Sequence, residues 1–352
     1  MSTLPPRCTI KDIAAKAGVA VSTVSYALRN HPSIPRATCM RIQEIATRMG
    51  YHPDPQISAL MAHIGRGRPV SSSSGLVALV WVHGTRETTR REHFFRQVLA
   101  GASERAALRG YRVEEFWPAE DGLSGRRLSG IFSARGIRSV LLAPGIAGVN
   151  VDYALDWKEL ACVVLGYARW PVELDRVAHD HFHGFCECLR RMALAGARRP
   201  AAVISREVNL RADHALEAAF ITHHPDERRA REFVHAVDAP RAPGFASWCR
   251  RMKPDGLLLL NRPMWERIDS PEARRLLKAG RVWNAEWQPD DPLRLPGVLQ
   301  RYDLAARAAV EMAIGLEQSR GYGVPGHPQW LQLRGDWREH GPAEGHAARD
   351  ED

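Results

Sequence analysis

Cysteine is scarce in this sequence of 352 residues, which contains only six, at irregular spacing. A small domain held together by disulfides needs a dense set of cysteines, so this spacing argues against a disulfide framework. The sequence also lacks any run of about 18 apolar residues, which argues against a membrane-spanning helix. Its first residues, MSTLPPRCTIKD, contain no apolar segment of the kind that a secretory signal requires. We therefore expect reduced thiols and a cytoplasmic location.

Known catalytic motifs are absent as well. The sequence contains no GxSxG, no GxxxxGK[ST] and no HExxH, and no GxGxxG follows an apolar run. Carboxylates and histidines are numerous, but the sequence places no pair of them together. We therefore expect a protein that is not an enzyme and that needs no cofactor.

Acidic residues are rare in the first fifth of the chain. Residues 1–69 contain nine lysines or arginines and three acids, a net charge of +6, whereas the whole sequence has a net charge of +9. Two-thirds of the excess positive charge thus lies in this short segment. Because a basic block neutralises phosphates and releases their counterions, we expect the segment to bind nucleic acid with an affinity that falls steeply with salt.

The same segment contains a helix-turn-helix pattern, TIKDIAAKAGVAVSTVSYALRN. Thr9 is suited to cap a first helix, with Asp12 three residues later in the position of a capping box. The apolar residues of this helix recur at helical spacing, and Gly18 follows them where a left-handed residue ends a helix. A second short helix is predicted to follow, with Val24 and Leu28 packed against the first.

The outer side of this second helix is the predicted DNA-contacting face. Because Val24 and Leu28 are expected to face inward, the opposite side would meet the major groove and its flanking phosphates. An ordinary helical hairpin with a solvated polar face is the alternative. A third amphipathic helix over residues 33–51, and a last helix too short to be stable alone, favour DNA binding. The residues of the predicted face are Val21, Ser22, Ser25, Tyr26 and Arg29.

The first sixty or so residues resemble the DNA-binding headpiece and hinge of the LacI/GalR (lactose-repressor) family of transcription regulators. The matching segments are TIKDIAAKAGV, STVS, MGYHPDP and, at the hinge, ISALM. The resemblance implies that Val21, Ser22 and Tyr26 contact base edges. It further implies that Ser25 and Thr38 contact phosphates, and that Leu60 wedges into the minor groove at the operator centre.

Three positions depart from the family pattern. Tyr26 stands where the family usually has an arginine that bonds guanine, Ala20 where it has a capping serine, and Cys39 where an arginine is common. A tyrosine offers one hydroxyl and a ring, so bidentate recognition of guanine is lost. We expect DNA binding to remain and the operator half-site to differ from the usual one.

A Gly/Ser-rich stretch, GRGRPVSSSSG, separates the basic segment from the rest of the chain. The expected domains are a headpiece at 1–64 with a hinge helix at about 54–64, a linker at 65–75, a two-lobed effector-binding and dimerisation domain at 76–337, and a disordered tail at 338–352.

Short apolar runs suited to buried parallel strands alternate with helical patterns in the second part. The runs are LVALVWV, SVLLAP, ACVVLGY, AAVIS and GLLLLN. Such alternation predicts an α/β doubly wound architecture, in which ligands bind at the carboxyl ends of strands and often between lobes. The segments RVAHDHFHG, RADHA and WLQLRGDW resemble the effector domain of the same family. This resemblance implies a two-lobed fold like that of sugar-binding periplasmic proteins.

The same resemblance gives seven candidates for effector contacts. An arginine and carboxylates around a cleft suit a hydroxyl-rich ligand such as a sugar, because they form charge-assisted hydrogen bonds. Any of the seven is equally suited to a surface or interdomain salt bridge. The candidates are His83, Asp180, Arg211, Asp213, Asn261, Glu286 and Trp287.

The segment HDHFHGFCEC suggests a competing hypothesis. His179, His181 and His183 alternate and would share one face of a strand, with Cys186 and Cys188 just beyond. Imidazole and thiolate groups suit zinc or copper, so a metal-responsive regulator is an alternative. A strand-to-helix turn at this point would separate the groups. The simpler interpretation places both cysteines on a helix and the histidines in a polar loop, with no metal site.

The sequence thus predicts a homodimeric, sequence-specific DNA-binding regulator, with repression the usual outcome in the family it resembles. It would bind near-palindromic, double-stranded operator DNA and respond to a small-molecule effector between two lobes. A solute-binding protein without a regulatory role would share the two-lobed fold, but it would not need the basic headpiece.

Overall fold

The computed structural model describes residues 9–28, 33–49, 51, 75–82, 84–143, 154–237, 242 and 244–339. The chain folds as two compact units, residues 1–71 and residues 72–352. The predicted hinge helix, with most of the predicted linker and tail, lies outside the described residues.

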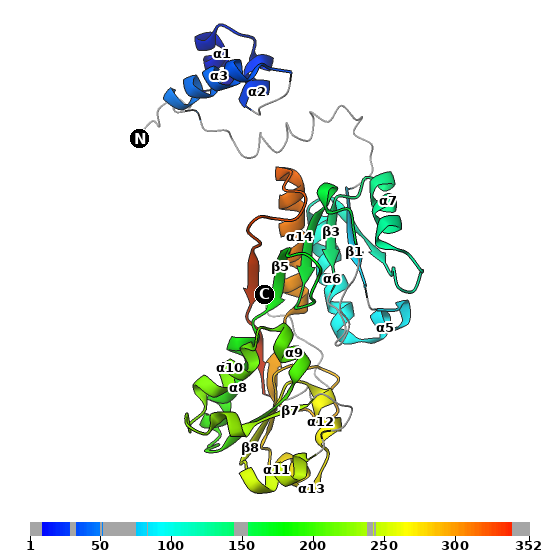
Figure 1. The fold of residues 1–352 in the computed structure, drawn as a ribbon, viewed down its shortest axis with the longest axis vertical. Helices are drawn as coiled ribbons and strands as arrows, with labels where there is room; N and C mark the ends of the chain where they lie inside the picture. The colour runs from blue at the N-terminus through cyan, green and yellow to red at the C-terminus, as the bar shows by residue number, and fades with distance from the viewer. Residues whose placement is uncertain are drawn as a thin grey trace, which may run out of the picture. The chain divides into compact units, whose positions relative to one another are not determined.

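The described part of the first unit is helical (Figure 1) and contains α1 (Ile10–Ala17), α2 (Val21–Leu28) and α3 (Arg36–Arg48). The predicted capping box is confirmed. Thr9 Oγ1 accepts a hydrogen bond from the Asp12 N–H at 3.4 Å, and Asp12 Oδ2 accepts one from the Thr9 N–H at 2.8 Å. α1 ends at Gly18, whose φ of +68° is the left-handed conformation that permits the tight turn into α2.

These three helices pack around a small apolar core. Ile13, Val24 and Ile42, one from each helix, are fully buried, and Leu28 packs against them as predicted. α3 begins later than predicted, after Pro35. The ring of a proline pushes the preceding residue into extended backbone, so the helix cannot start earlier.

The second unit contains two six-stranded sheets, each the centre of one lobe. The first sheet has the strand order β11 (Trp330–Leu333), β5 (Asp175–His179), β4 (Ala161–Leu165), β3 (Ser139–Leu142), β1 (Gly75–Val80), β2 (Tyr111–Phe116), with parallel pairing throughout. The second has the order β12 (Asp336–Arg338), β10 (Gly297–Leu299), β9 (Val282–Asn284), β8 (Gly256–Leu259), β6 (Pro200–Ser205), β7 (Val234–Val237), with one antiparallel pair, β10 with β12. All five apolar runs predicted as strands lie in these sheets, as β1, β3, β4, β6 and β8.

Helices cover both faces of the first sheet. Along β1, Val77 and Leu79 pack in one cluster with the helices α6 (His93–Leu108) and α14 (Tyr302–Ser319), while Ala78 and Val80 pack in another with α7 (Gly125–Arg135). This alternation follows from the two-residue period of a strand. Two short helical segments, α5 (Arg86–Arg91) and η1 (Trp157–Glu159), complete the described part of the lobe.

Helices of the second lobe pack on a single extended core that includes Phe185, Phe220 and Leu258. In chain order the helical segments are α8 (His181–Leu194), α9 (Arg206–Arg211), α10 (Ala215–His223), η2 (Ala230–Phe233), α11 (Phe245–Met252), α12 (Arg262–Ile268) and α13 (Pro271–Lys278). Figure 1 shows α11 and α13 at the end of this lobe away from α14.

The described chain crosses between the two lobes three times, after β5, after β10 and after β11. The crossings are bonded to one another. The Asp180 N–H of the first crossing donates to the Leu333 carbonyl of the third at 2.8 Å. Arg301, in the second crossing, pairs with Asp303 at 2.8 Å and with Asp336 at 3.0 Å. A small set of polar contacts therefore links the orientation of one lobe to that of the other.

The contact between α6 and α14 gives a first prediction. A Cβ added at Gly101 would lie well inside van der Waals contact of the Asp303 carbonyl oxygen, whereas one at Gly130, in the middle of α7, would meet nothing within 4 Å. We expect Gly101→Ala to lower the free energy of unfolding by about 1–3 kcal/mol through overpacking. The matched control Gly130→Ala should raise it by about 0.5–1 kcal/mol, because a helical alanine has less backbone freedom to lose. Urea unfolding of both variants tests this, and equal stabilities would refute the close packing.

Candidate functional site

The outer face of α2 is exposed where DNA contacts were predicted. Val21 and Tyr26 are 45% and 42% exposed, and Ser22 is exposed as well. Ser25 and, on α3, Thr38 are partly exposed. The predicted contacts Arg29 and Leu60, and the effector candidate His83, lie outside the described residues.

Exposed basic side chains lie on the two helices that contact α2. Lys11 and Lys16 on α1 are exposed, as are Arg36 and Arg41 on α3. Arg41 Nη1 also donates to the Ala17 carbonyl at 3.4 Å, which places its charge at the carboxyl end of α1, where a cation is favourable. The unit thus exposes the outer face of α2 together with positive charge on the two helices that contact it. DNA binding needs both features, because phosphate contacts position the protein while other side chains contact bases.

The second unit has a cavity of about 670 Å³ between its lobes, at the carboxyl ends of several strands. Such a position is the usual one for ligands in open α/β sheets. Its lining residues are Arg91, Glu92, His93, Phe94, Gly166, Tyr167 and His179 from the first lobe, His181, Val208, Arg211, Leu260, Asn261, Arg262, Pro263, Glu286, Gln288, Asp290 and Asp291 from the second, and Gln300 and Tyr302 from a crossing.

Three of the predicted effector contacts, Arg211, Asn261 and Glu286, line this cavity together. They come from α9, from the end of β8 and from just after β9, so the fold brings distant segments to one place.

Three other candidates do not line the cavity. Asp180 caps α8, where it accepts a hydrogen bond from the His183 N–H at 3.0 Å and lies 2.6 Å from His183 Nδ1. Asp213 has a side chain that is 74% exposed and lies 3.9 Å from Arg169. The remaining one, Trp287, bonds through its backbone N–H to the Val298 carbonyl.

Buried polar atoms without a protein partner are concentrated around this cavity. Among the described residues they include Asn261 Oδ1, Asp291 Oδ2 and both ring nitrogens of His179. The Arg211 guanidinium has one carboxylate nearby, Glu207 at 3.4 Å, and burial lowers its pKa. Buried polar groups in folded proteins are almost always hydrogen-bonded, so unpartnered groups mark this cavity as a candidate site for a polar ligand.

One wall of the cavity joins an acid to aromatic rings. The Tyr302 hydroxyl donates to Glu286 Oε1 at 3.3 Å and also bonds Gln300. The edge of one ring meets the face of the other between Phe94 and Tyr302, with centroids 4.4 Å apart. Burial raises the pKa of Glu286, while hydrogen bonds from Asn261 and Tyr302 oppose that rise. The wall thus offers an apolar ring surface beside a desolvated acceptor.

The opposite wall contains residues that the sequence analysis did not assign to the effector. His179 is only 6% exposed, and its ring lies 5.2 Å from that of His181. The Tyr167 ring stacks at a tilt 4.8 Å from His181, and its hydroxyl donates to the His179 carbonyl at 2.6 Å. Burial is the largest cause of the lowered pKa of both histidines, and it brings that of His181 to about 4. The sequence contained one signal for His179 and His181 as cavity residues: both lie at the carboxyl end of a strand, where ligands bind in open α/β sheets.

The predicted polar loop at HDHFHG is therefore wrong. His179 is the last residue of β5, and His181 and His183 lie in the first turn of α8. The strand ends and the helix begins at Asp180, so the three histidines do not share a face. Cys186 and Cys188 lie on α8 as predicted.

Two further findings concern the part of the chain that the structure describes. Within it, no group of three or more histidine, cysteine or acidic side chains is placed to hold a metal ion. None of its helices combines the length and the apolar character of a membrane span.

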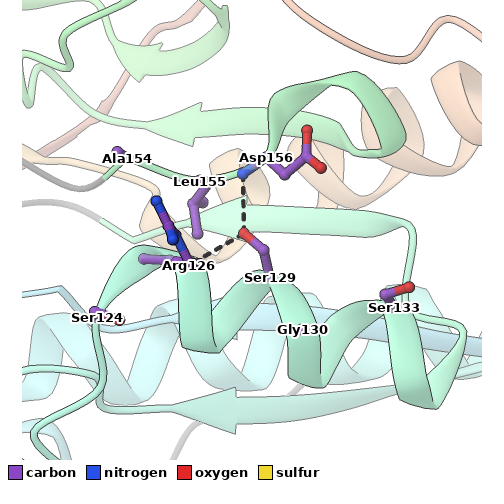
Figure 2. Close-up of a pocket in the computed structure, with 9 residues that line it drawn as sticks. Ser124, Arg126, Ser129, Gly130, Ser133, Ala154, Leu155 and Asp156 are labelled. Carbon is purple, nitrogen blue, oxygen red and sulfur yellow. Dashed lines mark hydrogen bonds between the residues drawn. The ribbon is translucent and has the colours of Figure 1, made fainter.

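A second hollow, about 860 Å³, runs along α7 in the first lobe (Figure 2). Ser129 joins α7 to the segment before η1. Its Oγ donates to the Gly125 carbonyl and accepts from the Asp156 N–H, both at 2.9 Å. Although this hollow is larger, no described residue that lines it has a buried polar atom without a partner. The interlobe cavity is the better candidate for a ligand site.

The lowered pKa of His181 gives a prediction for stability. In the unfolded chain a histidine has a pKa of about 6.5, so between pH 6.5 and about 4 the unfolded chain binds the additional proton. The stabilisation from neutral His181 is present above pH 6.5 and is lost as the pH falls to 4. We expect urea unfolding to show a smaller loss of stability between pH 7 and pH 4.5 in His181→Asn than in the unchanged protein. The exposed His327, changed to Asn, is the control. An unchanged pH profile in His181→Asn would contradict the burial argument.

Comparison with known proteins agrees with this architecture. The family described as "Bacterial regulatory proteins, lacI family" matches residues 9–54. The chain is 33% identical over 105 residues to the HTH-type transcriptional repressor CytR of Escherichia coli (strain K12). The aligned region covers 30% of this chain and 26% of that protein. It is 29% identical over 177 residues to the maltose regulon regulatory protein MalI of Escherichia coli (strain K12), covering 50% of this chain and 47% of that protein. The chain thus aligns with a quarter to a half of the length of these curated relatives.

Solved structures extend the likeness to the second unit. A complex of the transcriptional regulator CelR with cellobiose superposes with a TM-score of 0.53 at 18% identity, covering 95% of this chain and 99% of that one. A LacI-family regulatory protein from Chloroflexus aggregans gives a TM-score of 0.52 at 17% identity, covering 74% of this chain and 96% of that one. At such identities the likeness shows the fold alone, and it confirms the predicted fold class, a helix-turn-helix headpiece followed by a two-lobed α/β unit. Residues 9–54 thus match the lacI family of bacterial regulatory proteins, and the chain shares its fold with solved transcriptional regulators.

Proposed function

We propose that this chain is a DNA-binding transcriptional regulator, acting as a repressor and as a homodimer, whose operator affinity is set by a small hydroxyl-rich molecule in the interlobe cavity. The observation that carries the proposal is the family match over residues 9–54, on helices that expose the outer face of α2 and several basic side chains. The relatives CytR and MalI are named as regulators of transcription. Two headpieces related by a twofold axis would bind a near-palindromic operator. Since such DNA lies in the bacterial cytoplasm, we place the chain there.

The effector part of the proposal rests on the cavity chemistry. The Arg211 guanidinium is a donor, Asn261 Oδ1 and Asp291 Oδ2 are acceptors, and His179 offers both kinds of group. A ligand hydroxyl both donates and accepts, so a hydroxyl-rich molecule satisfies this mixture, and its apolar ring face would rest on Phe94 and Tyr302. The solved relative CelR is described in complex with cellobiose, which makes sugars the first ligands to test.

The crossings provide the link from ligand to DNA. Tyr302 lines the cavity and directly follows Arg301, whose ion pairs join α14 to β12. A ligand that bonds both lobes would favour one lobe orientation and shift the population of conformations competent for DNA.

We propose no catalytic role for the cavity. Among its described residues there is no serine, threonine or cysteine to act as a nucleophile beside a base. Its half-buried carboxylate Glu286 accepts a hydrogen bond from Tyr302.

Selection of bound fragments from a genomic library by the full chain tests DNA binding. We expect a palindromic site whose affinity falls steeply between 50 and 200 mM salt. Arg36→Gln should weaken binding to all sequences alike and lower the salt slope by about 1. Weak, sequence-independent binding by the intact protein would refute the regulator proposal.

Ligand binding is tested by thermal unfolding of the full chain with cellobiose, ribose and related sugars. For a sugar that stabilises the protein, we expect Arg211→Gln and Asn261→Ala each to weaken binding about tenfold or more, because each removes a buried hydrogen bond to the ligand. Operator affinity without the sugar should not change. Asp213→Asn, near Arg211 in sequence but outside the cavity, is the matched control and should bind as before. Equal losses in all three variants would remove the cavity from the proposal.

A further inference from the structure

The outer face of α2 is unusual because it is apolar at two points. Val21 and Tyr26 are among the exposed large hydrophobic residues of the described chain, and both lie on the predicted DNA-contacting side. The helix does not need them for its own packing, since Val24 and Ala27 fill the inner face and are fully buried. The two side chains are therefore exposed at the surface of the unit.

The same helix offers few polar means of recognising bases. α2 has the sequence VSTVSYAL, which contains no arginine, lysine, asparagine or glutamine. These four are the side chains that form bidentate hydrogen bonds to guanine or adenine in the major groove. Ser22 has a single hydroxyl, which bonds donors and acceptors alike and discriminates weakly. Within α2, discrimination among base pairs must come mainly from shape and apolar contact.

The surroundings identify the occupant of this apolar surface. Lys11 and Lys16 on α1 and Arg36 and Arg41 on α3 are exposed on the two helices that contact α2, and residues 1–69 have a net charge of +6, which favours a polyanion over an apolar protein surface. In the major groove of DNA, thymine alone presents a methyl group, at C5. If the positive charge of the unit brings α2 into the major groove, the most favourable contact for an apolar side chain is therefore a thymine methyl group.

We propose that Val21 and Tyr26 contact thymine methyl groups, so that each operator half-site has an A·T pair opposite each of these side chains. This inference rests on the proposed function, because α2 must first enter the major groove. It deepens that function by naming the base class that the half-site requires. The Tyr26 ring makes the apolar contact, and its hydroxyl is not needed for it.

The test uses the full chain and the operator that it selects. Each thymine of the half-site is replaced in turn by deoxyuridine, which lacks only the C5 methyl group. We expect about a fourfold loss of affinity at one or two thymines of each half-site, the effect of removing one buried methyl, and no loss at the others.

Protein variants assign each methyl to its side chain. Val21→Ala should abolish the deoxyuridine effect at one thymine, and Tyr26→Ala at another. Tyr26→Phe should keep it, because the ring is retained. Met40→Ala is the matched control, since Met40 is an apolar residue that is 63% exposed and lies on α3, not on α2. The deoxyuridine effects should persist in this variant. Affinity for unrelated DNA reports whether each headpiece is folded.

The outcomes separate the two proposals. If the chain selects no specific site, the proposed function fails, and this inference with it. If it selects a site whose affinity is indifferent to deoxyuridine, the thymine contact is refuted while the regulator proposal stands. A deoxyuridine effect that persists in both Val21→Ala and Tyr26→Ala would also overturn the assignment, because another residue would then hold the methyl groups.

Discussion

The second unit depends on one constraint: three chain crossings have to meet between two sheets without leaving their backbone unbonded. The Asp180 N–H bonds the Leu333 carbonyl between the first and third crossings, and the Arg301 guanidinium, which also bonds Asp303, links the second crossing to the third through Asp336. Hydrogen bonding to Asp303 raises the pKa of Arg301, which keeps the charge in place. His179 is packed into the same region, where a Cβ on Gly335 would lie 3.1 Å from its ring. The absence of a side chain at Gly335 lets the third crossing pass this close.

The polar groups that line the cavity are brought together by the crossings. Parallel strands end there, so the residues just beyond them converge from segments far apart in sequence. Burial acts on them together: it raises the pKa of Glu286 and lowers those of Arg211 and His181, so that each charged form is disfavoured. A polar ligand that bonds such desolvated groups gains more than it would from the same groups in water. A site built beside the crossings also lies where a small change of contact alters the lobe orientation most directly.

The headpiece differs from the second unit, because its proposed DNA contacts lie on an exposed surface and not in a cavity. Its core of Ile13, Val24 and Ile42 is small, and a capping box and a left-handed glycine hold the helix ends. Such local devices fix the angle between α1 and α2 with few residues. The outer face of α2 is not needed for this core, and it exposes Val21 and Tyr26.

The sequence by itself determined the elements whose signals are local. The Thr9 to Asp12 capping box and the turn at Gly18 involve groups three to nine residues apart, and the five apolar strands are buried on both faces, so their composition reveals them. The resemblance also gave Arg211, Asn261 and Glu286, which the fold brings into one cavity.

Only the tertiary structure decided the rest. β2 contains two glutamates and has no apolar run; it is a strand because it pairs with β1, and Trp81 Nε1 donates to Glu115. β5 buries Asp175 and Arg176, which are tolerated because Asp175 accepts the Gln329 N–H and Arg176 donates to two carbonyls. Asp213 follows Arg211 by two residues, yet the side chain of Asp213 is exposed while Arg211 lines the interlobe cavity. Burial and hydrogen-bond partners depend on segments far along the chain, and no local pattern records them.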